Sequence, residues 1–209
     1  MIHDPTNLLT AGVPLREATR VLVLVHGRGG RAQDMLALAN SLTVSDMALV
    51  APQAANNTWY PQSFLQPTAQ NEPFLSSALT VLGGVRARLQ TDFNLKTPQI
   101  YWLGFSQGAC LLLEFMARNP ALYGGIFGLS GGLIGPNGTA RNYPGTFAGT
   151  PVVLGCSNVD PHIPEARVWE TEAVLSGMGA VVQTRIYPNG AHTINEDEVY
   201  LVNTVLDPG

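Results

Sequence analysis

Short apolar segments alternate with longer amphipathic segments along most of the chain. Most of the short segments lack polar alternation, which is typical of strands buried on both faces of a sheet. The predicted strands are VLVLV (21–25), MALVA (47–51), QIYWL (99–103), GIFGL (125–129), PVVLGC (151–156) and VVQTRIY (181–187). The predicted helices are 33–42, 73–89, 107–118, 164–178 and 195–206. This alternation predicts an α/β fold with a mostly parallel central sheet and helices on both of its faces.

Two long segments rich in Pro, Gly, Asn, Gln and Thr, 52–71 and 131–150, interrupt this pattern. Loops of that length in a compact domain usually carry function, and both follow a predicted strand. In an open parallel sheet the loops after strands gather at the carboxyl edge, where ligands bind. Because no linker or repeat is visible, we expect residues 1–209 to form one domain.

Composition narrows the class of partner. The 209 residues are 45% hydrophobic and 12% charged, with a net charge of −4 and scattered basic residues. Such a chain can bury a sizeable core, but it lacks the basic patch of a nucleic-acid-binding protein or a membrane-surface protein. We therefore expect a small-molecule partner and no nucleic acid.

Targeting signals and metal motifs are not visible in the sequence. Residues 1–14 contain no basic region followed by an apolar run, and no apolar segment is long enough to span a bilayer. Cys110 and Cys156 have no CxxC spacing, so neither a disulfide scaffold nor a zinc site is predicted. We expect a cytoplasmic protein without a metal or cofactor, and a homodimer remains open.

The segment GFSQG, 104–108, joins a predicted strand directly to a predicted helix. A serine between two glycines at such a junction favours a sharp turn that holds the serine hydroxyl out of the core. The N–H of Gln107 would lie in the first helical turn without an intrahelical partner, so it could bind an oxyanion. Ser106 is therefore the candidate nucleophile. The alternative is a glycine-rich strand-to-helix turn without catalytic function.

A serine nucleophile requires a base, and the chain has four histidines. His192 in NGAH lies between the last predicted strand and the last helix, at the same sheet edge as Ser106, and is the candidate base. His26 ends a strand and is expected to support a turn by hydrogen bonding. His162 is expected at the rim of the site, and His3 is expected to be solvated near the terminus.

The acid that orients the base should follow a strand and lie between the serine and the histidine in the order Ser, Asp, His. Asp160 in VDPHIP meets both conditions. Its alternative is a structural Asp-Pro turn before a helix. The other acids in the interval lie on predicted helices: Glu114, Glu165, Glu170 and Glu172.

The segment HGRGG, 26–30, follows the first long strand and is the candidate second oxyanion loop. We expect the N–H of Arg28 to pair with that of Gln107 in binding the oxyanion. A phosphate-binding loop is the alternative, but the segment lacks the lysine of a Walker loop and the GxGxxG spacing.

Together HGRGG, APQAANNTWYP, GFSQGA, DPHIP and NGAH resemble the phospholipase/carboxylesterase family of α/β-hydrolases, in that order and over nearly the whole chain. The resemblance implies a single-domain α/β-hydrolase with Ser106, Asp160 and His192 as the triad. It also implies that Trp59 belongs to the loop lining the acyl pocket, with burial as a loop anchor as the alternative. We expect His162 to contribute to substrate binding at the rim.

Three departures from the family pattern concern the substrate. Where members with apolar acyl tunnels often carry HGLG, this chain has Arg28, whose guanidinium could bind a carboxylate or phosphate or point to solvent. The segment 155–160 is somewhat longer than in the thioesterase branch, and Ala191 precedes the histidine. Long-chain lipid substrates are therefore in doubt.

The resulting hypothesis is a serine esterase that hydrolyses carboxylic esters of small or medium acyl groups. A thioesterase or lysophospholipase could use the same triad, and sequence does not separate them. A dienelactone hydrolase fits less well, because its nucleophile would be a cysteine in the elbow, whereas Cys110 lies four positions later. From another class, a catalytically inactive binding protein on a hydrolase fold remains an alternative.

Overall fold

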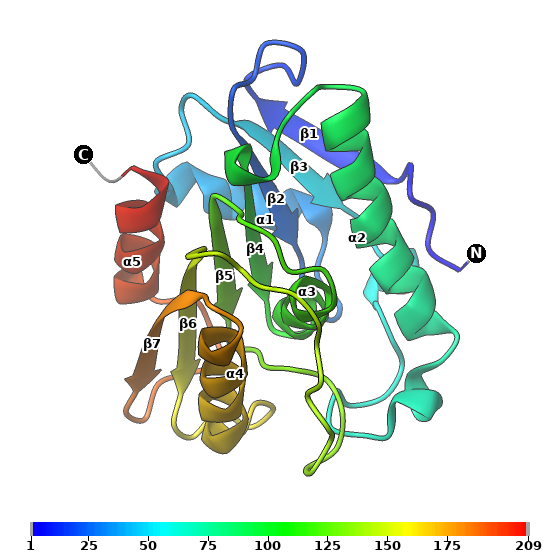
Figure 1. Ribbon diagram of the computed structural model, residues 1–209, viewed down its shortest axis with the longest axis vertical. Coiled ribbons are helices and arrows are strands. Elements are labelled where there is room, and N and C mark those ends of the chain that lie inside the picture. Colours follow the sequence, from blue (N-terminus) through cyan, green and yellow to red (C-terminus); the bar gives the residue numbers. More distant parts are fainter. Residues whose placement is uncertain (1, 208–209) are drawn as a thin grey trace.

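A computed structural model of the chain describes residues 2–207. Seven strands form one sheet in the order β1-β3-β2-β4-β5-β6-β7, in which only β1 is antiparallel to its neighbour (Figure 1). The strands are β1 Leu8–Gly12, β2 Val21–Val25, β3 Ala48–Pro52, β4 Ile100–Phe105, β5 Gly125–Leu129, β6 Pro151–Ser157 and β7 Val181–Tyr187. The helices are α1 Ala32–Leu38, α2 Phe74–Thr91, α3 Gln107–Arg118, α4 Glu165–Gly177 and α5 Glu196–Leu206. The predicted α/β fold with a mostly parallel sheet is confirmed.

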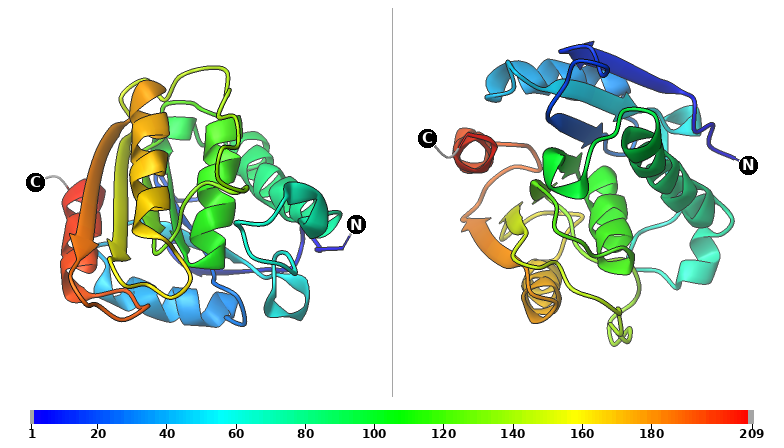
Figure 2. Two further views of the ribbon diagram at one scale, coloured as in Figure 1. Left: turned by 90° about the horizontal axis from the view of Figure 1, so that it is seen from below. Right: turned by 45° about the horizontal axis from the view of Figure 1, so that its top comes forward.

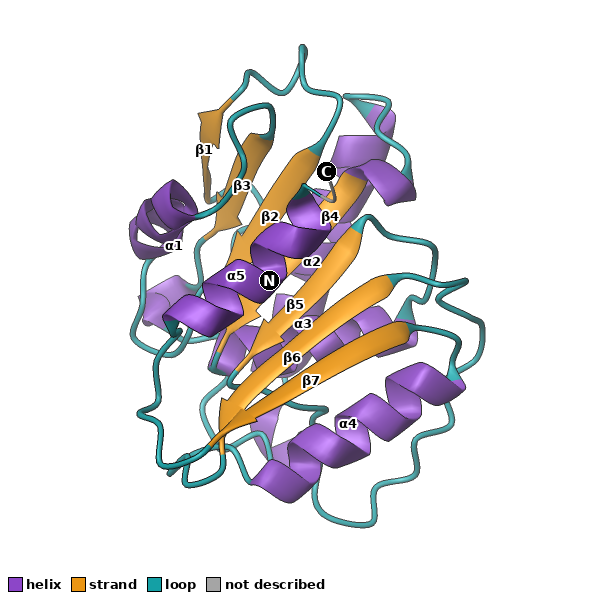
Figure 3. Ribbon diagram, turned by 90° about the vertical axis from the view of Figure 1, so that its left-hand side faces the viewer, coloured by secondary structure: helices purple, strands orange, loops and turns teal. Residues whose placement is uncertain are grey.

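Central strand β2 is buried on both faces. Its five side chains are all 0% exposed and divide between two cores, because successive side chains of a strand point to opposite faces. Val21, Val23 and Val25 pack with residues of α2, α3 and α4. Leu22 and Leu24 pack with residues of α1 and α5. The predicted two helical layers are therefore present, with α2, α3 and α4 on one face and α1 and α5 on the other (Figure 3).

Strand β1, at one edge of the sheet, and the end of α1 differ from prediction, whereas edge strand β7 has the predicted bounds. Strand β1 was missed because LLTAG is only partly buried and offers just two large apolar side chains. Strand β7, at the other edge, has an alternating exposed and half-buried pattern. Figure 2 shows α5, in red, on the opposite side of β7 from α4. First helix α1 ends at Leu38, earlier than predicted, because the chain tightens there into a 3-10 turn over Ala39–Ser41.

The long loops after β3 and β5 begin at the carboxyl edge, as predicted. The loop after β3 runs to α2 and contains two 3-10 turns, Ala55–Asn57 and Thr68–Asn71. Among residues 2–207, no helix has the length and apolar character needed to cross a bilayer.

Candidate active site

Ser106 occupies a one-residue turn between β4 and α3. Its φ of 54° and ψ of −121° lie outside the ordinary regions for a residue with a side chain, and its N–H donates to Leu129 O at 2.9 Å. A Cβ on Gly104 would lie 2.7 Å from the Cα of Ala109, and one on Gly108 would collide with the carbonyls of Val25 and His26. Close packing of β4, α3 and β2 therefore requires both glycines and projects the Ser106 hydroxyl outward.

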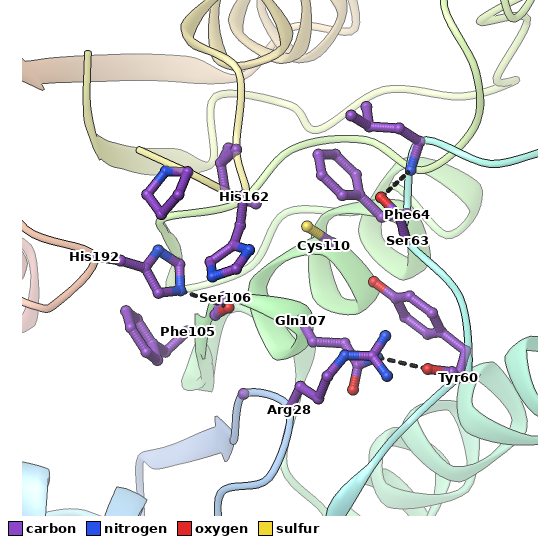
Figure 4. A pocket seen from close by; sticks show the side chains of 14 residues that line it. Arg28, Tyr60, Ser63, Phe64, Phe105, Ser106, Gln107, Cys110, His162 and His192 are labelled. Carbon is purple, nitrogen blue, oxygen red and sulfur yellow. Dashed lines mark hydrogen bonds between the residues drawn. The ribbon is translucent and has the colours of Figure 1, made fainter. Parts of the chain in front are cut away.

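Three of the predicted side chains form one hydrogen-bonded series. His192 Nε2 lies 2.8 Å from Ser106 Oγ (Figure 4). Its Nδ1 lies 2.6 Å from Asp160 Oδ2. The residues come from the carboxyl ends of three strands, since Ser106 follows β4, Asp160 follows β6 and His192 follows β7. With Nδ1–H donating to the carboxylate, Nε2 is free to accept the serine proton.

Asp160 is held as a carboxylate at the end of β6. Its Oδ1 accepts the backbone N–H groups of His162 at 2.8 Å and Ile163 at 3.0 Å. Burial alone would raise the pKa of Asp160, but the hydrogen bonds from His192 and these two N–H groups hold it below its ordinary value. The acid is therefore ionised when it bonds to His192.

Arg28 and Gln107 line the same cavity as Ser106, and their backbone N–H groups donate no hydrogen bond to any described residue. Gln107 begins α3, so its N–H is at the positive end of the helix dipole. Its side chain is used elsewhere: Oε1 accepts from Trp59 N at 2.9 Å, and Nε2 donates to Tyr60 O at 2.8 Å. The two free N–H groups can donate hydrogen bonds to a developing oxyanion.

A cavity of about 470 Å³ opens beside Ser106 and His192. Its volume lies within the range of small-molecule sites. The remaining lining residues are Gly27, Arg28, Tyr60, Ser63, Phe64, Leu65, Phe105, Gln107, Cys110, Pro161, His162 and Ile163. In Figure 4 His192 and Phe105 lie on one side of Ser106, and Tyr60, Phe64 and Cys110 lie on the other.

The Arg28 side chain holds the loop after β3. Its NH1 donates to Pro61 O at 3.0 Å and its NH2 donates to Gln62 O at 2.8 Å, while the guanidinium carbon lies 6.0 Å from the centre of the Tyr60 ring. No carboxylate of the described residues pairs with it. Arg28 thus joins the loop after β2 to the cavity wall and carries a positive charge there without a carboxylate partner among the described residues.

Trp59 belongs to the cavity-lining loop but does not itself line the cavity. Its side chain is 0% exposed, stacks on His26 with ring centres 5.0 Å apart, and donates from Nε1 to His26 O at 2.8 Å. The structure therefore places Trp59 as a buried anchor, and its neighbours Tyr60, Phe64 and Leu65 form the wall.

The other histidines differ in their surroundings. His26 is buried, with Nδ1 donating to Gly27 O at 2.7 Å and Nε2 accepting from Ala54 N at 3.1 Å, which fits its predicted role in a turn. His162 is exposed and lines the cavity, with its ring edge-to-face on His192 at 5.0 Å. Burial lowers the pKa of His26, so its imidazole is neutral in the folded protein.

His3 is not solvated, contrary to expectation. It is 0% exposed, with Nε2 donating to Trp59 O at 2.8 Å and Nδ1 accepting from Ala55 N at 3.1 Å. The N-terminal segment therefore packs against the loop after β3 and holds it at Ala55 and Trp59, whereas Arg28 holds it at Pro61 and Gln62. The sequence carried no local signal for this contact, because its partners lie more than fifty positions away.

Both cysteines are free and buried. Cys110 follows Ser106 by one turn of α3, and burial raises its pKa to about 12. Cys156 lies on β6 within 3.7 Å of Asp160 Oδ2, and burial together with the Asp160 charge raises its pKa to about 12. Neither thiol is activated as a nucleophile.

Comparison with known proteins identifies the family. The model of the phospholipase/carboxylesterase family matches residues 12–207. A crystal structure of a phospholipase/carboxylesterase from Dyadobacter fermentans is 46% identical, covers 99% of both chains and superposes with a TM-score of 0.95. Acyl-protein thioesterase 1 of Saccharomyces cerevisiae is 27% identical over 178 residues, 76% of this chain and 78% of the relative. The crystal structure of esterase PE8, 24% identical with a TM-score of 0.79 over 95% of this chain and 96% of the other, shares the fold. The chain therefore belongs to the phospholipase/carboxylesterase family, a family of hydrolases with the α/β-hydrolase fold.

Proposed function

We propose that this protein is a cofactor-free serine esterase that hydrolyses carboxylic esters of small or medium acyl groups through an acyl-enzyme on Ser106. The observation that carries the proposal is the series of hydrogen bonds from Ser106 through His192 to Asp160, placed beside two unpaired N–H groups. The cavity volume supports an acyl group of modest size.

In the proposed reaction, His192 Nε2 takes the Ser106 proton as Oγ attacks the ester carbonyl. The N–H groups of Arg28 and Gln107 stabilise the oxyanion of the tetrahedral intermediate. His192 then returns the proton to the departing alcohol oxygen. Water, activated by the same imidazole, attacks the acyl-enzyme and releases the acid, while ionised Asp160 keeps the tautomer with the proton on Nδ1.

Replacement of Ser106 tests the proposal. We expect Ser106→Ala to abolish ester hydrolysis and labelling by a fluorophosphonate probe, because no other activated nucleophile lines the cavity. Ser76→Ala is the matched control, since Ser76 is exposed on α2 and bonds to Glu72 away from the cavity. Probe labelling that persists in Ser106→Ala would overturn the assignment. A wild-type protein that neither reacts with the probe nor hydrolyses any ester would favour an inactive binding protein.

A thioesterase is the second candidate, favoured by the similarity to the yeast acyl-protein thioesterase. The same groups can cleave an oxygen ester or a thioester, because the acyl-enzyme is common to both reactions. Matched oxygen esters and thioesters of one acyl group, compared by kcat/KM, separate the two activities. The cytoplasmic location and the homodimer stay predictions.

A further inference from the structure

The Tyr60 hydroxyl is a polar group without a strong partner at the wall of the cavity. The residue is 1% exposed, and its hydroxyl points into the cavity beside the Cys110 thiol, which is a weak acceptor (Figure 4). Its side-chain hydrogen bond is with the Cys110 thiol, a weak partner. Burial raises the pKa of Tyr60 well above its ordinary value, so the phenol keeps its proton. It is a hydrogen-bond donor that could exchange this weak partner for an oxygen of the substrate.

The direction of the proposed reaction places the acyl group next to this hydroxyl. His192 must reach the departing alcohol oxygen, so the alcohol lies on the His192 side of Ser106. The acyl group then extends to the opposite side, where Figure 4 shows Tyr60, Phe64 and Cys110. Cys110 is one helical turn from Ser106, about 6 Å along α3. Because the Tyr60 hydroxyl lies beside Cys110, a short acyl chain attached to Ser106 would be long enough to reach it.

The charges around the cavity favour an acyl group that carries an oxygen acceptor near the Tyr60 hydroxyl. No Asp or Glu lines the cavity, and Arg28 contributes a positive charge whose neighbours are neutral carbonyls. Phe64, Leu65 and Ile163 supply the apolar part of the wall. An alkyl chain that filled this space would leave the phenol with only the thiol as its partner, whereas an oxygen at the same place would accept its proton.

We propose that Tyr60 is a specificity-determining residue that selects short acyl groups carrying an oxygen acceptor near their far end, such as oxoacyl or carboxyacyl groups, over plain alkanoyl groups. The inference rests on the proposed esterase function, because it assigns the acyl side of the cavity from the position of His192. A ketone and a carboxylate share the acceptor chemistry that the phenol recognises.

Three ethyl esters whose acyl chains have five heavy atoms in line test the inference: ethyl pentanoate, ethyl 4-oxopentanoate and monoethyl succinate, in which an oxygen replaces the fifth carbon. Acid release measured at constant pH gives kcat/KM for each. For each enzyme, kcat/KM for an oxygenated ester is divided by kcat/KM for ethyl pentanoate. This ratio does not depend on the fraction of protein that is folded. We expect Tyr60→Phe to lower this ratio about three- to tenfold for at least one oxygenated ester, as loss of one neutral hydrogen bond does.

Tyr123→Phe is the matched control, because Tyr123 is also buried but its hydroxyl donates to Asn119 O away from the cavity. Its ratios should equal those of the wild type. Equal ratios in wild type and Tyr60→Phe would overturn the inference while leaving the esterase proposal intact. Hydrolysis of none of the three esters by the wild type, together with absent probe labelling, would overturn both.

The two oxygenated esters distinguish the chemical source of the acceptor. If the natural acyl group carries a carboxylate, Arg28→Gln should lower the succinate ratio and leave the oxopentanoate ratio unchanged, because only the anion feels the guanidinium charge. If the acceptor is neutral, Tyr60→Phe should lower the oxopentanoate ratio and Arg28→Gln should change neither. Only a ratio lowered in Tyr60→Phe supports Tyr60 as the selecting residue; Arg28→Gln then tells whether the acceptor that Tyr60 recognises is charged or neutral.

Discussion

At the scale of single residues, the tautomer of His192 depends on the carboxylate of Asp160. Oδ1 of Asp160 is already held by two backbone N–H groups, so only Oδ2 faces the imidazole. In Asp160→Asn the amide oxygen would keep those two N–H groups, and the NH2 group would face Nδ1. His192 would then carry its proton on Nε2, where it cannot accept the proton of Ser106.

We therefore expect Asp160→Asn to fold normally and to lose roughly 10⁴ in kcat, as removal of the orienting acid does in a serine triad. Steady-state kinetics on a short-chain ester measure the loss, and urea unfolding checks the fold. Asp92→Asn, an exposed carboxylate at the end of α2, is the control. Activity near wild type in Asp160→Asn would show that a different acid orients the base.

Chain order and topology were enough to predict that Ser106, Asp160 and His192 would lie at one edge of the sheet, while their catalytic roles stay predictions. Ser106, Asp160 and His192 each follow a parallel strand, so the carboxyl edge brings them together whatever the details of the loops. Side-chain direction was harder to predict. Nothing local in HGRGG indicates that the Arg28 guanidinium would bind the carbonyls of Pro61 and Gln62, because that contact depends on the path of a loop more than thirty positions away.

At the scale of elements, the close approach of α3 to β2 and β4 determines which glycines the chain can exchange. Gly108 has the carbonyls of Val25 and His26 where a Cβ would lie. Gly83, in the middle of α2, has only a Phe115 ring atom 3.8 Å from such a Cβ, an ordinary van der Waals distance. Gly108 is therefore required by packing, whereas Gly83 has no packing role and only weakens helix α2.

Alanine at these two positions should therefore act in opposite directions. Gly108→Ala should destabilise the protein by about 1–3 kcal/mol or more through overpacking against backbone, with loss of activity as the elbow shifts. Gly83→Ala should stabilise by about 1 kcal/mol, because alanine is the better helix former. Thermal unfolding measures both, with a shift of roughly 2–4 °C for each kcal/mol. A Tm for Gly108→Ala at or above that of the wild type would contradict the packing argument.

Element boundaries were predictable where burial and local chemistry agree. Strand β5 and helix α3 have the predicted bounds, because their apolar runs end at glycine, serine or asparagine. Strand β1 has no such pattern. Strand β1 forms because it pairs with β3 and so supplies hydrogen bonds to an otherwise open sheet edge. This stabilisation depends on a distant strand and is not visible in the five residues of β1 themselves.

At the scale of the whole molecule, two buried histidines link stability to pH. Burial lowers the pKa of both His3 and His26 from the ordinary 6.5. Above pH 6.5 both are neutral in the folded and the unfolded chain. As the pH falls below 6.5, the unfolded chain binds protons that the folded protein does not, so stability is lost toward acid. Each histidine contributes up to about 1.4 kcal/mol per pH unit.

Replacing His3 should therefore reduce the dependence of stability on pH. In His3→Gln the free energy of unfolding should be lower than in the wild type at pH 7.5, through loss of the bond from Ala55 N, but should fall less between pH 6.5 and 5. Buried Glu198, whose pKa is raised to about 7 by burial, acts in the opposite direction in both proteins and cancels in the comparison. Urea unfolding across this range measures the slopes, and identical slopes would show that His3 does not titrate on unfolding.

The burial of Cys110 and Cys156 has a practical consequence for site-specific fluorescent labelling of the protein. With pKa values of about 12, only about one thiol in ten thousand is ionised at pH 8, so thiol-directed dyes should react slowly with the unmodified chain. A cysteine introduced at an exposed position would then be the single site of labelling. Ser63→Cys, at an exposed position of the cavity-lining loop, would place a fluorophore where its emission could report the arrival of a substrate in real time.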